Sequence, residues 1–158
     1  MKPFISSVDY TSKYVHPVSS GTTDPTSEDR NDCGLRAYCN VTGKSFKDAQ
    51  IIFAKQGRKY QRGTPVLTLN KIMKNAGFKP EVMGSVGVVK YMESQSELRS
   101  TGPSRTIKSL LNDRKYQQGK HVFCVKDHAL AVVDGKVLDT FSSSASARVY
   151  VVYSSVGT

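Results

Sequence analysis

Long apolar runs are missing from this sequence. None approaches the roughly 20 residues that a membrane-spanning helix needs. The N-terminal segment Met1–Asp9 lacks the apolar stretch of a secretory signal. Cysteine is also scarce, because there are only 3, an odd number without the dense pairing of a disulfide-rich chain. These absences argue against a membrane-spanning or secreted protein and favour a reducing compartment, the cytoplasm.

Motifs for cofactors and metals are missing as well. The glycines around Gly84 and Gly87 are too sparse for the Gly-x-Gly-x-x-Gly pattern that binds phosphates. The spacing His121-x-x-Cys124-x-x-x-His128 suggests zinc, but positions 121 and 124 of a strand point to opposite faces, and no Cys-x-x-Cys pair supports it. No internal repeat or heptad is visible. We therefore expect neither a cofactor nor a bound metal.

Acidic residues are outnumbered by basic ones. The chain has 13 Asp and Glu against 23 Lys and Arg, which gives a net charge of +10. An excess of this size favours contact with nucleic acid, acidic protein surfaces or anionic lipid. The basic residues are scattered rather than grouped in blocks, so nucleic-acid binding is not our first interpretation. The length fits a single domain over 1–158, with 1–26 as an irregular N-terminal extension.

Cys33 stands where a polar loop gives way to a helical pattern. The helix is expected to run to about Val41 and to stop before Gly43. Asn31 or Asp32 can cap it by accepting hydrogen bonds from its first backbone N–H groups. Those N–H groups and the positive end of the helix dipole favour an anion in the first turn. A cysteine there is held more readily as the thiolate, so we interpret Cys33 as a candidate nucleophile.

A candidate base and its orienting group lie near the other end of the chain. Asp134-Gly135, between two apolar runs, is typical of a two-residue β-hairpin turn. Such a turn sets the register Val133 opposite Lys136, Val132 opposite Val137, and Leu130 opposite Asp139. His128 and Asp139 then share one face as diagonal neighbours, with Cβ atoms roughly 7 Å apart or less. A carboxylate there can fix the tautomer of the imidazole and stabilise its charged form.

Asp-Cys-Gly at the start of a helix, a late strand that begins with histidine, and an aspartate in the next strand together resemble the papain-like cysteine peptidases. The similarity spans 27–140 and is nearest to the compact bacterial and phage-type branch, which includes the bacteriocin-processing, double-glycine leader peptidases. It implies a papain-like fold with Cys33 as nucleophile, His128 as general base and acid, and Asp139 as the third member of the triad. It also implies a protein or peptide substrate in the cytoplasm, that of the host cell if the chain is phage-encoded.

The chain departs from that branch at the oxyanion hole. The branch usually has a glutamine about six residues before the cysteine, which supplies a donor to the developing oxyanion. This chain has Ser27 at that position, followed by Glu28 and Asp29. Asn31 is the nearest side-chain amide, so it is the candidate donor, together with the backbone N–H of Cys33.

The order of the expected elements favours an α+β fold. Helices come first and strands late, which is typical of helices packed on an antiparallel sheet rather than of a parallel α/β fold. After the Cys33 helix we expect a second helix from the N-cap Ser45 to Gly57, and a third with Thr64 as its cap and Pro65 in its first turn, ending at Gly77. Further along we expect short strands at 82–83 and 86–89, a polar loop over 92–103, a short helix over 106–112 capped by Ser104, and strands over 120–126, 128–133, 136–140 and 148–153.

Other cysteines and histidines have simpler interpretations. Cys39 lies about 240° around the helix from Cys33, so it is expected to face away and into the core. Cys124 is expected in the core because it stands among valine and phenylalanine in a strand. His121 has no carboxylate placed beside it, and His16 falls in an irregular segment.

Each member of the proposed triad also has a purely structural interpretation. Cys33 can be a buried structural thiol, His128 a histidine satisfied by backbone groups, and Asp139 a partner of a lysine or arginine. Asp127 is next to His128 but points to the other strand face, and Asp134 is used by the turn.

Two functions from different classes follow. The first is a thiol hydrolase, most readily a peptidase, that cleaves an amide or isopeptide bond through an acyl-enzyme on Cys33 with His128 as base and acid. The second is a catalytically weak papain-like scaffold whose positive charge binds an acidic protein or nucleic acid. A cell-wall amidase is disfavoured by the lack of an export signal and of wall-binding repeats.

Overall fold

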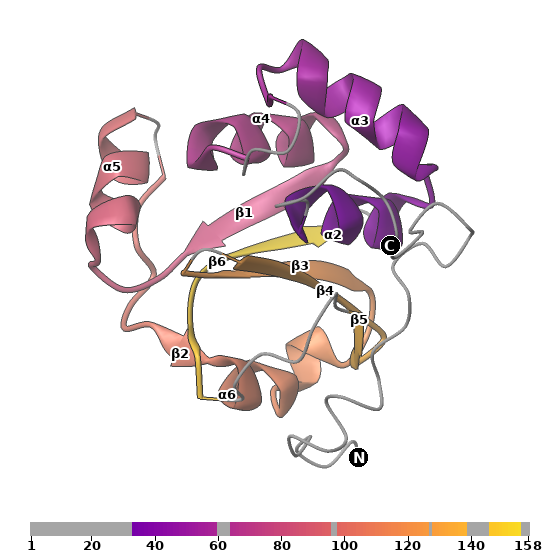
Figure 1. The fold of residues 1–158 in the computed structure, drawn as a ribbon. Helices are drawn as coiled ribbons and strands as arrows, with labels where there is room; N and C mark the ends of the chain where they lie inside the picture. Colours follow the sequence, from indigo (N-terminus) through magenta and orange to yellow (C-terminus); the bar gives the residue numbers. More distant parts are fainter. Residues whose placement is uncertain (1–32, 60–63, 96–97, 127, 139–145, 156–158) are drawn as a thin grey trace.

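Helices occupy the N-terminal part of the chain and an antiparallel sheet the C-terminal part (Figure 1). The structure is a computed structural model that describes residues 33–59, 64–95, 98–126, 128–138 and 146–155. The expected α+β class is therefore confirmed for these residues. The helices are α2 (Cys33–Thr42), α3 (Phe46–Lys55), α4 (Val66–Asn75), α5 (Gly87–Gln95), α6 (Ile107–Leu111) and the 3-10 helix η1 (Arg114–Tyr116). The strands are β1 (Phe78–Val82), β2 (Arg105–Thr106), β3 (Lys120–Val125), β4 (His128–Val133), β5 (Lys136–Leu138) and β6 (Arg148–Ser155).

The described strands form one sheet in the order β1-β6-β3-β4-β5, with β2 also paired to β6. Every pair is antiparallel. None of the helices in the described ranges has both the length and the apolar character needed to cross a bilayer.

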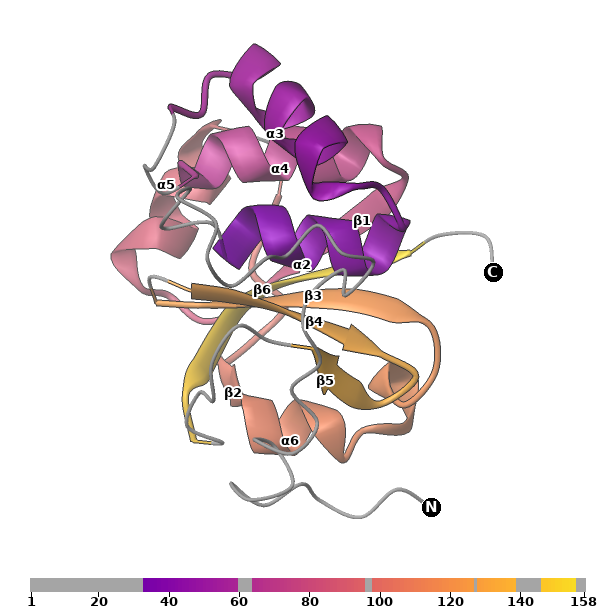
Figure 2. The ribbon, with the colours of Figure 1, turned by 45° about the vertical axis from the view of Figure 1, so that its right-hand side comes forward.

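The sheet is covered on both faces. Figure 2 shows α2 directly on one face, α3 and α4 outside it, and α6 on the opposite face. Side chains alternate along the strands and so feed two separate clusters. In β3, Val122 and Cys124 join the cluster on the α2 side, whereas Phe123 and Val125 join the cluster on the α6 side.

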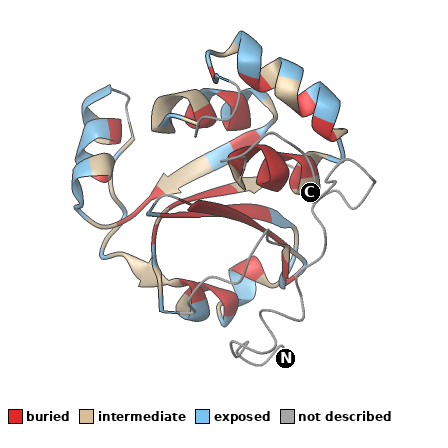
Figure 3. Ribbon diagram, in the orientation of Figure 1, coloured by how far each residue is buried: buried red, intermediate tan, exposed pale blue. Residues whose placement is uncertain are grey.

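Helix α2 is the most enclosed of the helices. Its described side chains are buried along most of its length, and the central strands beneath it are buried too (Figure 3). Leu35, Tyr38 and Cys39 are each at most 3% exposed. Even Arg36 is buried, with its guanidinium 5.1 Å from the centroid of the Phe46 ring. Because α2 packs on both β3 and β4, its position is fixed by the sheet.

The hairpin between β4 and β5 follows the sequence prediction. Asp134 and Gly135 have φ angles of 50° and 79°, the positive values that a type I′ turn requires. The expected pairs Val133 with Lys136 and Val132 with Val137 are confirmed. The last expected pair includes Asp139, which lies outside the described residues.

Helix α3 also begins and ends where the sequence indicates. The Ser45 hydroxyl accepts a hydrogen bond from the backbone N–H of Asp48 at 3.1 Å, as an N-cap should. Phe46, Ala49 and Phe53 are buried on one side of the helix.

The predicted cap of α4 was wrong. Pro65 is the N-cap and makes no side-chain capping bond. The residue before a proline is biased toward extended backbone, and the Oγ1 of Thr64 is buried rather than turned to the free N–H groups. Thr64 therefore does not cap the helix.

The segment 82–106 needs four further corrections. Of the strand predicted at 82–83, only Val82 lies in a strand, as the last residue of β1. Most of the strand predicted at 86–89 is instead the start of α5, which also occupies part of the predicted loop over 92–103. Val89 and Met92, three residues apart, are the buried side of that helix. The cap of α6 is Thr106, not Ser104, because Arg105 and Thr106 still pair with β6.

A bulge in β6 shifts its register by one residue. Cys124 pairs with Val151 but Val125 pairs with Val149, which leaves Tyr150 as the extra residue. Val149 therefore joins the α6-side cluster and Val151 the α2-side cluster. The bulge lies at the end of the sheet where β4 begins.

Candidate functional site

Cys33 is the first residue of α2, as predicted, and is half-buried. It packs against the α2-side cluster. Burial raises the pKa of the Cys124 thiol far above its ordinary value, and the neighbouring Cys33 adds to that rise. Cys33 therefore lies near Cys124, whose ladder partners are Ala129 and Val151.

The other two cysteines are core residues. Cys39 is 1% exposed and Cys124 is 2% exposed, which confirms both predictions. Cys33 is the most accessible of the chain's three thiols, so it is the one available to a reagent or substrate.

His128 is the first residue of β4 and is buried, with 8% of its surface exposed. It pairs with Val125, one step along the ladder from Cys124 and Ala129. The fold thus brings His128 and Cys33 to the same end of the sheet, although they lie far apart in the sequence.

The two residues do not share a face of the sheet. Alternation along β4 assigns His128 to the side of Leu130 and Val132, in the α6-side cluster, whereas Cys33 packs on the α2 side. His128 is the first residue of its strand and therefore lies at the end of the sheet. A dyad requires the imidazole to reach around that end toward α2.

Asn31 and Asp139, the predicted oxyanion donor and third triad member, lie outside the described residues. So do Ser27, Asp127 and His16. The pairing of Ala131 with Leu138 is the last described step of the ladder that the Asp139 prediction uses.

His121 is held on the α6 side of the sheet, away from Cys33. Its Nε2 lies 2.7 Å from the carbonyl oxygen of Gln118, and its Nδ1 lies 2.8 Å from the Ser154 hydroxyl. A carbonyl only accepts, so Nε2 carries the proton and Nδ1 accepts from Ser154. The neutral ring is therefore fully bonded. Because Cys124 faces the α2 side, His121 and Cys124 lie on opposite faces of β3, as the sequence indicated.

Acid is expected to destabilise the protein through His121. Burial lowers the pKa of His121 below its ordinary value of 6.5, so the unfolded chain takes up this proton first as the pH falls. The contribution of His121 to the free energy of unfolding is therefore fully present above pH 6.5 and is lost as the pH falls below it. Urea unfolding on both sides of that pH, with wild type and His121→Gln, measures the effect. The variant should lose less stability on acidification, and an equal loss in both proteins would contradict the assignment.

A pocket that the sequence did not reveal lies at the same end of the sheet. It encloses about 590 Å³. Thr64 comes two residues before the pocket residue Val66. It lies close to α2 at Gly34, the residue after Cys33, because a β-carbon on Gly34 would be 3.5 Å from Thr64 Oγ1. Lys126 follows the ladder partner of His128. The pocket is lined by Val66, Val86, Val88, Ser104, Lys126, Arg148, Val149 and Tyr150.

Thr64 was also missed as a residue of this site. Its Oγ1 is buried and has no hydrogen-bond partner among the described residues. It lies against Gly34, the residue after the candidate nucleophile. Sequence reasoning assigned its hydroxyl to helix capping, and no pattern in the chain indicated the contact with α2.

Groups of three or more His, Cys, Asp or Glu side chains that could hold a metal are not found in the part of the chain that the structure describes. A scan against models of protein families finds no match, and neither curated proteins nor solved structures give a significant one.

Proposed function

We propose that this protein is a papain-like thiol hydrolase, most readily a cysteine peptidase, with Cys33 as its nucleophile. One observation carries the proposal. Cys33 is the half-buried first residue of a ten-residue helix that packs on β4, the strand that begins with His128. The first N–H groups of a helix have no partner within it, and with the helix dipole they favour a thiolate and a developing oxyanion at that end.

The proposed reaction uses the residues in the roles that the resemblance implies. The Cys33 sulfur attacks the carbonyl carbon, His128 protonates the leaving amine, and an acyl-enzyme forms. Water that gives its proton to His128 then releases the acid. Asp139 orients His128, and Asn31 with the Cys33 backbone N–H binds the oxyanion.

The pocket at this end of the sheet, called the valine-rich pocket after Val66, Val86, Val88 and Val149, supports a peptide substrate. Its walls are largely apolar, and two cationic residues, Lys126 and Arg148, also line it. The Arg148 guanidinium donates to the carbonyl oxygen of Ser104 at 3.1 Å, which holds it in place. We infer that the pocket receives an apolar side chain with an acidic group nearby.

Alkylation of Cys33 tests the proposal. Iodoacetamide labelling, read by peptide mass across a pH series, should be fast near neutral pH in wild type and about tenfold or more slower in His128→Ala. Cys39 and Cys124 are buried internal controls and should stay unlabelled in the folded protein. His121→Gln is the matched histidine control and should leave the profile unchanged. An ordinary thiol profile that His128→Ala does not alter would contradict the catalytic role.

The runner-up is a papain-like scaffold that binds an acidic protein or nucleic acid. The observation that favours it is the assignment of His128 and Cys33 to opposite faces of the sheet. The net charge of +10 supplies the attraction. Under this alternative Cys33 labels like an ordinary thiol, and association with an acidic partner weakens steeply as salt is added.

A further inference from the structure

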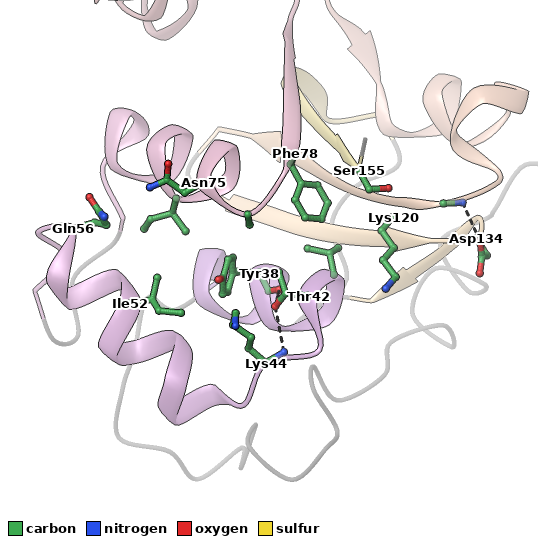
Figure 4. Close-up of a pocket in the computed structure, with 14 residues that line it drawn as sticks. Tyr38, Thr42, Lys44, Ile52, Gln56, Asn75, Phe78, Lys120, Asp134 and Ser155 are labelled. Carbon is green, nitrogen blue, oxygen red and sulfur yellow. Dashed lines mark hydrogen bonds between the residues drawn. The ribbon is translucent and has the colours of Figure 1, made fainter. Parts of the chain in front are cut away.

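A second pocket lies at the other end of α2 from Cys33. It encloses about 630 Å³, within the range of sites for small organic molecules. The C-terminal half of α2 forms one wall, α3 and the end of α4 form others, and the sheet contributes the first residues of β1 and β3 (Figure 4). The pocket does not include Cys33, His128 or any residue of the valine-rich pocket.

The walls of this pocket are apolar and firmly held. Val41 and Ile72 are each 2% exposed, Tyr38 is 3% exposed and Phe78 is 6% exposed. The Tyr38 ring packs edge-on against Phe53 at 5.3 Å between centroids. Burial raises the pKa of the Tyr38 phenol, so that group stays uncharged. The walls therefore favour a hydrocarbon group of a ligand over a charged group.

Positive charge stands at the mouth. Lys44 and Lys120 are exposed lining residues, and Figure 4 shows their side chains on two sides of the group formed by Tyr38, Thr42 and Phe78. Lys120 is opposite Val133, and Val133 is opposite Lys136, so a third lysine follows on the same face of the sheet.

Among the described residues that line the pocket, one is a carboxylate, and it already accepts a hydrogen bond. Asp134 accepts a hydrogen bond from the backbone N–H of Gly119 at 2.9 Å, and its own N–H donates to the Gly119 carbonyl at 2.9 Å. These bonds join the end of β4 to Gly119, the residue before β3. The mouth therefore offers an excess of cations above an apolar floor.

We propose that this pocket binds a small amphipathic anion, a monocarboxylate with an aliphatic tail. The tail lies against the half-buried apolar lining residues Ile52 and Ala76, and the carboxylate lies between Lys44 and Lys120. An amphipathic cation is repelled by the same lysines, and a neutral alcohol gains the apolar contact without the charge pairing. The proposal is independent of the chemistry at Cys33, because the pocket and the nucleophile are at opposite ends of α2.

Calorimetric titration with sodium octanoate tests the proposal. Octanoate should bind wild type with measurable affinity, and octanol and octyltrimethylammonium should bind more weakly. Lys44→Gln and Lys120→Gln should each weaken octanoate binding about twofold to fivefold, as expected for exposed ion pairs. Lys90→Gln, an exposed lysine on α5 outside the pocket, is the matched control and should bind as wild type does.

Two further variants separate this site from the candidate active site. Ala76→Phe fills the pocket from the half-buried end of α4 and should abolish octanoate binding, with folding checked by circular dichroism. Cys33→Ser should bind octanoate as wild type does, whatever the outcome of the alkylation experiment. Absence of octanoate binding, or equal affinity for octanoate and octanol, would overturn the proposal.

Discussion

Replacement of Phe123 by alanine is expected to lower the free energy of unfolding by about 3–5 kcal/mol. Phe123 is fully buried in β3, a central strand of the described sheet, and faces the α6 side. Its ring stands edge-on to Tyr116 at 5.6 Å between centroids. Removal of the ring creates a cavity between β3 and the elements beneath it, and the close packing around it limits collapse of that cavity. Urea unfolding at neutral pH measures the loss.

The matched control is Tyr91→Ala. Tyr91 is an aromatic residue of α5 that is 52% exposed, so its removal should change the unfolding free energy by no more than about 0.5 kcal/mol. A similar loss in both variants would mean that Phe123 is not the packing centre that its burial indicates. A small loss for Phe123→Ala alone would mean that α6 can close on the sheet without it.

Replacement of Ala131 by leucine is expected to cost about 1–3 kcal/mol and to disturb the nucleophile as well. Ala131 is fully buried on the side of β4 that faces α2, and Ala129 beside it is 6% exposed. These small side chains let α2 lie close to the strand. A leucine there must push α2 outward, and α2 carries Cys33 at its first residue. Both the unfolding free energy and the rate of Cys33 alkylation should therefore change.

The same substitution at an exposed position is the control. Ala54 lies on the outer side of α3, where leucine meets solvent, so Ala54→Leu should leave both readouts close to wild type. If Ala131→Leu changed stability but not the labelling rate, α2 would be free to adjust without moving its N-terminus. That result would separate the packing of the helix from the reactivity of its first residue.

Local signals in the sequence predicted the elements whose ends are chemically marked. The serine cap of α3 and the Asp134-Gly135 turn are each set by a few neighbouring residues, and both were confirmed. The segment 86–95 was predicted wrongly, because valines at 86, 88 and 89 resemble a strand when only composition is considered. Burial of Val89 and Met92 against the rest of the fold decides that it is a helix, and that information is not local.

For the candidate site, the sequence predicted where Cys33 and His128 stand in their helix and strand but not how these elements are arranged. The place of Cys33 at the start of a helix, and the hairpin register that follows His128, came from spacing alone. The face on which His128 lies depends on how β4 pairs with β3 and how α2 crosses both, which no short pattern encodes. The same holds for the contact of Thr64 with α2 and for both pockets, since each is formed by residues distant in sequence.

The position of β6 in the sheet has a consequence for how the protein is made. Of the described strands β6 comes last in chain order, yet it lies between β3 and the pair β1 and β2. Until β6 has left the ribosome, β1 has no strand to pair with, and β3 has an unpaired edge on the side that β6 will occupy. Pairing over such long sequence separations is slow, and open edges can pair with other chains. Folding of the sheet is therefore expected to finish only after β6 has been synthesised, and until then these edges are open to pairing with other chains.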